Sequence, residues 1–220
     1  MNNLGLPLLL KSITIHQTIL GHKMIILTKD ILLKTHLLAL LISTTLSFSA
    51  TAANTYTVDP KHTFPGFEIN HLGFSIQRGR FNKTSGKITL NPKLSAGNID
   101  ITIETASIDT GFAELEKHLR GQDFLDAKRY PKITFLANRL SFDKNQLIAA
   151  DGLLTLHGIA KPVHLKIDHF YCGMNLITLK NTCGANITST LKRSDFGIDK
   201  YAPKLADEVS IVIPIEATKD

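Results

Sequence analysis

Apolar and polar residues alternate with a period of two through most of the chain after Ala52. The alternation is clearest in segments 99–104, 163–168 and 208–215, where isoleucine, leucine and valine occupy every second position. Successive side chains of a strand point to opposite faces, so this pattern is typical of antiparallel strands with one buried face and one face in water. We count eight or nine such segments, which are enough to close a barrel or to fill a sandwich.

One segment departs from this period. Phe112, Leu115 and Leu119 fall at i, i+3 and i+7, which places three apolar side chains along one stripe of an α-helix, and Gly121 can end that helix. A short helix inside a run of strands predicts a lid over a barrel end or, equally, a plug at a sheet edge. No internal repeat or linker interrupts residues 54–220. We therefore predict one all-β domain over residues 53–220, an antiparallel eight-stranded lipocalin-like barrel with a short helical insertion acting as a lid.

An outer-membrane barrel of eight strands would have a similar length, but it would turn apolar residues outward and carry aromatic girdles. Here the polar faces of the strands carry charge pairs such as Asp100 with Glu104 and Lys166 with Asp168, and the chain has no Trp and four Tyr. The simplest arrangement puts these charges in water and the apolar residues inside. Such a barrel holds either its own side chains or one small ligand, and the pattern leaves both interiors open.

Residues 1–52 have the features of a secretory signal peptide. Lys34 precedes an uncharged stretch over residues 37–48, and a small-x-small cleavage site follows at Ala50-Thr51-Ala52. A stretch of this length falls short of the ~20 residues that a membrane-spanning helix needs, and a retained anchor over residues 25–46 would contain charges. The part before Met24 is long for a signal peptide, so Met24 is the expected start. We predict export of the domain to the periplasm, or secretion.

The two cysteines, Cys172 and Cys183, enclose a short segment, predicted to be polar, between two strand-like runs. In an oxidising compartment they would form a disulfide, worth about 2–3 kcal/mol in the chain-entropy model. A zinc site would need two more ligands. Residues 1–52 contribute half of the formal charge of +6, so the remaining basic excess is too weak to indicate nucleic-acid binding.

Catalytic motifs are missing from the sequence. It contains no G-x-S-x-G elbow, no H-E-x-x-H and no glycine-rich phosphate loop, and its carboxylates are scattered along strand faces. His71 shares a predicted face with Phe67 and Ile69, and His118 lies in the predicted helix. Each histidine is either a core residue or a contact for the polar head of a ligand. We expect no enzyme activity, no catalytic residues and no metal site.

Short motifs follow one another along residues 54–220: Asp59-Pro60-Lys61-His62, His71-Leu72-Gly73-Phe74-Ser75, Gly79-Arg80-Phe81, Ile108-Asp109-Thr110, His118-Leu119-Arg120, Asp123-Phe124-Leu125, Tyr130-Pro131, Gly152-Leu153-Leu154, His157-Gly158, Lys161-Pro162-Val163 and Arg193-Ser194-Asp195-Phe196-Gly197. In its residues and in their order along the chain, this set of motifs resembles the YceI-like family of periplasmic polyisoprenoid-binding proteins. Each motif alone is weak, and the ordered set is specific. The cysteine pair resembles a subgroup trait.

The resemblance implies a barrel with a long isoprenoid or other amphiphile threaded through its interior. Members of the family resemble carriers or storage proteins, and dimers occur among them. The implied ligand contacts are apolar side chains, with His71 and His118 as the polar candidates at a mouth. The full set is Phe67, Ile69, His71, Phe74, Phe81, Ile101, Ile103, His118, Leu119, Phe124, Phe135 and Leu154.

The expected function is therefore to bind, and to carry or sequester, an isoprenoid-like lipid such as a polyprenyl chain or a quinone. No cofactor would be required beyond this amphiphile, and we expect no nucleic-acid partner, no stable membrane insertion and a homodimer as one form. The alternative is a structural or interaction barrel with a protein partner and an interior filled by side chains. A long apolar cavity would separate the two.

Overall fold

The computed structural model describes residues 53–220, apart from residues 92 and 94. The predicted signal peptide, its cleavage site and the Met24 start lie outside this range. The described strands are β1 (Asn54–Val58), β2 (Gly66–His71), β3 (Ser75–Phe81), β4 (Thr84–Asn91), β5 (Ala96–Glu104), β6 (Ile108–Asp109), β7 (Lys132–Asp143), β8 (Gln146–Leu156), β9 (Ile159–Asn175), β10 (Lys180–Lys192) and β11 (Glu208–Lys219). The helices are the 3₁₀ turns η2 (Thr105–Ser107) and η3 (Arg193–Phe196) and the α-helix α2 (Ala113–Leu119).

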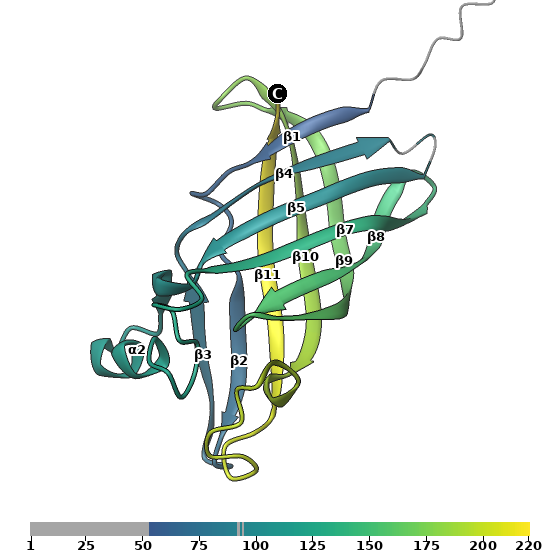
Figure 1. Ribbon diagram of the computed structural model, residues 1–220. Coiled ribbons are helices and arrows are strands. Elements are labelled where there is room, and N and C mark those ends of the chain that lie inside the picture. Colours follow the sequence, from purple (N-terminus) through teal and green to yellow (C-terminus); the bar gives the residue numbers. More distant parts are fainter. Residues whose placement is uncertain (1–52, 92, 94) are drawn as a thin grey trace, which may run out of the picture. The chain divides into compact units, whose positions relative to one another are not determined.

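Eight of these strands close into a barrel (Figure 1). They follow one another in the order β1, β4, β5, β7, β8, β9, β10 and β11, and β11 pairs back onto β1. Every pairing is antiparallel. The predicted antiparallel eight-stranded barrel is confirmed.

The edge of β11 that faces β1 changes partner partway along the strand. Its last residues pair with β1, as in Val58↔Ala217, and its first residues pair with β2, as in Ile69↔Val209. β2 then continues the sheet through β3 to β6, beyond the closed ring. The barrel wall is therefore longer on this side, and the β2–β3 hairpin extends it at one end (Figure 1).

Thr63 fills the seam between β1 and β2. This side chain is almost completely buried. Its Oγ1 accepts from the backbone N–H of Glu216 at 3.1 Å and donates to the carbonyl of Glu216 at 3.2 Å, and that carbonyl also accepts from the N–H of Asp59 at 2.9 Å. The hydroxyl thus replaces the strand pairing that β11 loses where it changes partner, because a buried backbone N–H needs an acceptor.

The period-two pattern produces the barrel core as predicted, because alternate residues turn inward. Tyr56, Leu90, Cys183 and Ala217 are buried together with isoleucines such as Ile99 from neighbouring strands. The first four lie near the end of the barrel that holds the last residues of β11. They close that end of the interior.

The β9–β10 hairpin stands at the same end (Figure 1). The disulfide between Cys172 and Cys183 is confirmed, with an S–S distance of 2.06 Å, and it joins directly opposite residues of the two strands. The segment between the cysteines is less polar than predicted, since Leu176, Ile177 and Leu179 are strongly exposed at its tip. The prediction of a polar segment gave weight to the asparagines and threonines and overlooked these aliphatic residues.

The opposite end carries α2, the β2–β3 hairpin and the loop that follows β10 (Figure 1). Arg193 organises this loop from a buried position. Its guanidinium donates to four backbone carbonyls, those of Ile198, Lys200, Leu205 and Ala206, at 2.8–3.1 Å. None of the helices in the described residues is both long enough and apolar enough to cross a membrane.

Candidate functional site

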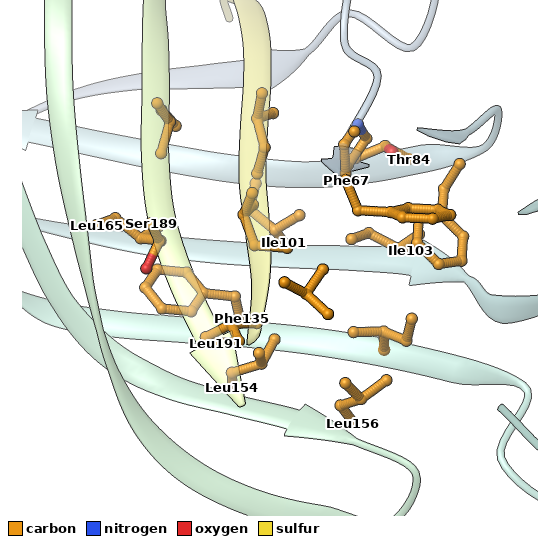
Figure 2. A pocket seen from close by; sticks show the side chains of 18 of the residues that line it. Phe67, Thr84, Ile101, Ile103, Phe135, Leu154, Leu156, Leu165, Ser189 and Leu191 are labelled. Atoms are coloured by element: carbon orange, nitrogen blue, oxygen red, sulfur yellow. The ribbon is translucent and has the colours of Figure 1, made fainter. Parts of the chain in front are cut away.

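A cavity of about 750 Å³ occupies the interior of the barrel. Side chains from strands that are far apart in the sequence point into it, including Phe67 of β2, Ile101 and Ile103 of β5, Phe135 of β7 and Leu154 of β8 (Figure 2). Its wall is almost entirely apolar. The interior is therefore not filled by the protein's own side chains.

Eleven of the twelve predicted ligand contacts line this cavity: Phe67, Ile69, His71, Phe81, Ile101, Ile103, His118, Leu119, Phe124, Phe135 and Leu154. The alternation placed the strand residues correctly, because an inward residue of a hollow barrel faces the hollow. Whether each one touches a ligand stays a prediction.

Phe74 is the exception, and its expected place in the cavity wall is wrong. The side chain is 87% exposed in the turn between β2 and β3 and does not line the cavity. The N–H of Phe74 donates to the carbonyl of His71 at 3.0 Å, while Leu72 and Gly73 adopt positive φ. The strand ends at His71, so the inward–outward alternation does not continue to Phe74.

The cavity opens at the end opposite the β9–β10 hairpin. There His71, Phe112 and Tyr201 both line the cavity and remain exposed to solvent. His118 of α2 packs edge-on against Phe124 at 4.8 Å between ring centroids and stacks near Tyr201 at 6.5 Å. Helix α2 therefore forms part of the mouth, as expected of a lid.

One polar side chain inside the cavity was missed by the sequence analysis. Thr84 is only 4% exposed and faces the cavity, and its Oγ1 has no hydrogen-bond partner in the part of the chain that the structure describes (Figure 2). By contrast, the Oγ of Ser189 donates to the carbonyl of His164 at 2.7 Å. Thr84 lies an even number of positions from Ile88 and Leu90 of the same strand, so the alternation could have predicted that its side chain points into the barrel.

Asp59, His62 and Glu216 form a polar group outside the cavity. Their ligand atoms lie within 4.8 Å of one another, the only such triad of potential metal ligands among the described residues. His62 Nδ1 donates to Asp59 Oδ2 at 2.7 Å. This hydrogen bond raises the pKa of His62 and lowers the pKa of Asp59. The ion pair accounts for the arrangement, and the group is not part of the candidate site.

Comparison with known proteins gives one consistent result. Residues 56–217 match the YceI-like domain. Protein YceI of Escherichia coli O157:H7 is 35% identical over 174 residues, which cover 78% of this chain and 90% of that protein. A UPF0312 protein of Vibrio cholerae serotype O1 (strain M66-2) is 35% identical over 154 residues, covering 69% of this chain and 80% of the relative.

Solved structures agree with this match. The crystal structure of Burkholderia cenocepacia BcnA superposes with a TM-score of 0.63 at 27% identity, covering 73% of this chain and 99% of that chain. A polyisoprenoid binding domain from Saccharophagus degradans, implicated in plant cell wall breakdown, gives a TM-score of 0.57 at 14% identity over 75% of this chain and 98% of that chain. The second likeness concerns the fold alone.

Proposed function

Because the chain belongs to the YceI-like family, we propose that it binds an isoprenoid-like lipid inside the barrel and carries or sequesters it in the periplasm. The observation that carries the proposal is the apolar cavity of about 750 Å³, which ends against the buried residues Tyr56 and Leu90. This volume lies within the ~300–1,000 Å³ range of sites for lipophilic small molecules. The alternative of a barrel filled by its own side chains does not account for such a space.

The apolar wall suits a long hydrocarbon tail. Each Å² of apolar surface that leaves water contributes roughly 25 cal/mol, so a tail can bind with few polar contacts. The closed end, formed by Tyr56 and Leu90, would receive the end of the tail. The head group would lie on the side of the mouth, where His71 and His118 offer ring nitrogens and Arg78 offers a guanidinium.

Thr84 adds a hydrogen-bond donor within the wall. The carbonyl of a quinone or the oxygen of an alcohol at this depth would accept from its Oγ1. A ligand with such an oxygen would relieve the cost of a buried unpaired hydroxyl, which is about 1–3 kcal/mol. Thr84 is the first residue of β4, at the other end of the strand from Leu90, so this favours a lipid whose head-group oxygen enters the cavity over a plain hydrocarbon.

Binding without catalysis fits the polar groups of the wall. Acyl or phosphoryl transfer needs a nucleophile in hydrogen-bond contact with a base. Among the serine and threonine hydroxyls that line the cavity in the described residues, Thr63 bonds to Glu216, Ser189 to the carbonyl of His164 and Thr110 to the carbonyl of Phe112, while Thr84 has no partner. The periplasmic location is supported by the signal-like residues 1–52 and by the Cys172–Cys183 disulfide, which persists in oxidising compartments.

The test is native mass spectrometry of the protein exported from bacterial cells and purified without detergent. We expect an added mass that extracts into organic solvent as an isoprenoid, and uptake of added quinone or polyprenol by protein stripped of lipid. A protein that stays free of lipid after incubation with both would refute the proposal.

Two neighbouring residues of β8 give a matched pair of variants. Leu154 lines the cavity, whereas Leu153 is on the outer face of the barrel. Leu154→Gln places an amide against the tail, and an unpaired polar group costs about 1–3 kcal/mol, or roughly 5- to 150-fold in Kd. Leu153→Gln should leave Kd unchanged. Equal weakening by the two substitutions would show that the lipid does not bind inside the barrel.

A further inference from the structure

The tip of the β9–β10 hairpin exposes more apolar surface than a soluble protein usually shows at one place. Exposure of its large apolar side chains ranges from 55% for Met174 to 93% for Ile177, with Leu176 and Leu179 between these values. From Gly173 to Asn181 the two strands pair only with each other, so the tip stands clear of the barrel. Contiguous exposed apolar groups of this kind mark interaction sites.

The tip has a fixed conformation. The disulfide joins the two strands at its base, and Asn175 Oδ1 accepts from the N–H groups of Ile177 and Thr178 at 2.9 and 3.1 Å. The N–H of Leu179 donates to the carbonyl of Asn175 at 2.8 Å, and Leu179 has a φ of 56°. Glycine or asparagine occupies such a left-handed position at lower cost. The turn thus holds the side chain of Leu179 in solvent, where it is 74% exposed.

The charges near the tip match an anionic surface. No Asp or Glu occurs between His169 and Lys192, and Lys180 directly follows the turn, where it pairs with Asn175. The neighbouring end of β11 carries Asp220, whose Oδ2 lies 2.9 Å from Lys87 Nζ. The carboxylate of Asp220 is therefore neutralised by a partner of its own.

We propose that the β9–β10 hairpin docks the protein on an anionic lipid bilayer by inserting Leu176, Ile177 and Leu179. Three residues separate the disulfide from the turn, which corresponds to roughly 10 Å of strand. This length matches the ~5–10 Å to which apolar groups of interfacial proteins enter a bilayer. Lys180, which pairs with Asn175 beside the turn, would extend its ammonium group back to the head groups, where lysine side chains are favoured. Tyr171, which is exposed and lies on the barrel side of the disulfide, would lie nearer the water side of the bilayer surface.

The chemistry of the tip fits lipid better than a protein surface. Protein–protein hot spots are rich in Trp, Tyr and Arg, whereas leucine is under-represented in them. The tip offers aliphatic side chains, and the amide of Asn175 is used within the turn. A bilayer accepts such a surface because it demands no directional polar contact. This docking does not depend on what the cavity holds.

Flotation with vesicles of phosphatidylethanolamine and phosphatidylglycerol tests the proposal on the exported protein. We expect the wild-type protein to float with the vesicles, and Ile177→Asn to weaken vesicle binding at least about tenfold, since full burial of an isoleucine is worth more than one decade of affinity. Phe74→Asn is the matched control. Phe74 is similarly exposed but lies at the opposite end of the barrel. It belongs to the turn that follows β2, and β2 pairs with the first residues of β11. Its substitution should leave vesicle binding unchanged.

Three outcomes would overturn the docking proposal. Equal losses in the two variants would indicate non-specific adsorption. Absence of flotation for a wild-type protein that still takes up lipid would refute docking while leaving the proposed function intact. A dimer in analytical ultracentrifugation that Ile177→Asn dissociates, without any vesicle binding, would assign the tip to a second copy of the chain.

Discussion

Two buried threonines provide a test of how this barrel uses its hydroxyl groups. Thr84 and Thr63 are both almost completely buried, but the Thr84 hydroxyl has no partner within the described residues, whereas the Thr63 hydroxyl bonds to both backbone groups of Glu216. Replacement by valine removes the hydroxyl and keeps the shape of the side chain. The two substitutions should therefore change the stability of the ligand-free protein in opposite directions.

The magnitudes follow from the contacts. Thr84→Val removes an unpaired buried hydroxyl and should raise the free energy of unfolding by about 1 kcal/mol, the lower end of the cost of such a group. Thr63→Val leaves the N–H of Glu216 without an acceptor, while the carbonyl of Glu216 keeps its bond from the N–H of Asp59. One orphaned backbone donor should cost about 1–3 kcal/mol.

Thermal unfolding followed by circular dichroism measures both variants without lipid. At about 2–4 °C per kcal/mol for a domain of this size, Thr84→Val should raise Tm by a few degrees and Thr63→Val should lower it by several. A decrease in Tm for Thr84→Val would refute the reasoning, since it would mean that the hydroxyl has a stabilising partner. With a quinone bound, the advantage of Thr84→Val should shrink, because the wild-type hydroxyl then has an acceptor.

Three further results are expected. Replacing Cys172 and Cys183 together by alanine should lower the free energy of unfolding by about 3 kcal/mol in urea titrations, given a sequence separation of 11, and reductant should have no further effect on that variant. Asp59→Asn should lower the pKa of His62 toward its ordinary value in an NMR titration, because the hydrogen bond that His62 donates to the Asp59 carboxylate raises this pKa. In the wild-type protein the stabilisation from protonated His62 is complete below its unfolded-state pKa and is lost as pH rises through the raised folded-state pKa, so this dependence should vanish in the variant. Arg193→Met leaves four carbonyls without this donor and should cost at least about 2 kcal/mol, with faster proteolysis of the loop after β10; an unchanged cleavage rate would argue against the role of this side chain in the loop.

The strand faces could be read from the sequence because side-chain direction in a strand depends only on position. Ile101 and Ile103 illustrate the limit of this reasoning. Both line the cavity, but the same alternation of inward residues would also fit a barrel with a filled core. Whether an inward residue meets another side chain or empty space depends on the curvature of the closed ring. That curvature arises from pairings between distant segments, which a local pattern does not contain.

Other features of the structure could not be predicted from the sequence, also for physical reasons. Thr63 stabilises the seam of β11 through a contact with Glu216, more than 150 positions away, so no local motif marks its role. Phe74 belongs to a recognisable motif but lies in a turn, where alternation has no meaning. The apolar tip of the β9–β10 hairpin was predicted to be polar because the sequence does not show that the side chain of Asn175 is hydrogen-bonded within the turn.

The closed end of the barrel has a consequence for selectivity among guests of different length. A tail that already reaches Tyr56 and Leu90 has no room to extend, so any further isoprene unit stays in water outside the mouth and contributes no burial. Affinity across a homologous series should climb with each added unit and then become constant. The tail length at which affinity levels off would report the depth of the cavity, measured from the mouth to the buried residues near the disulfide.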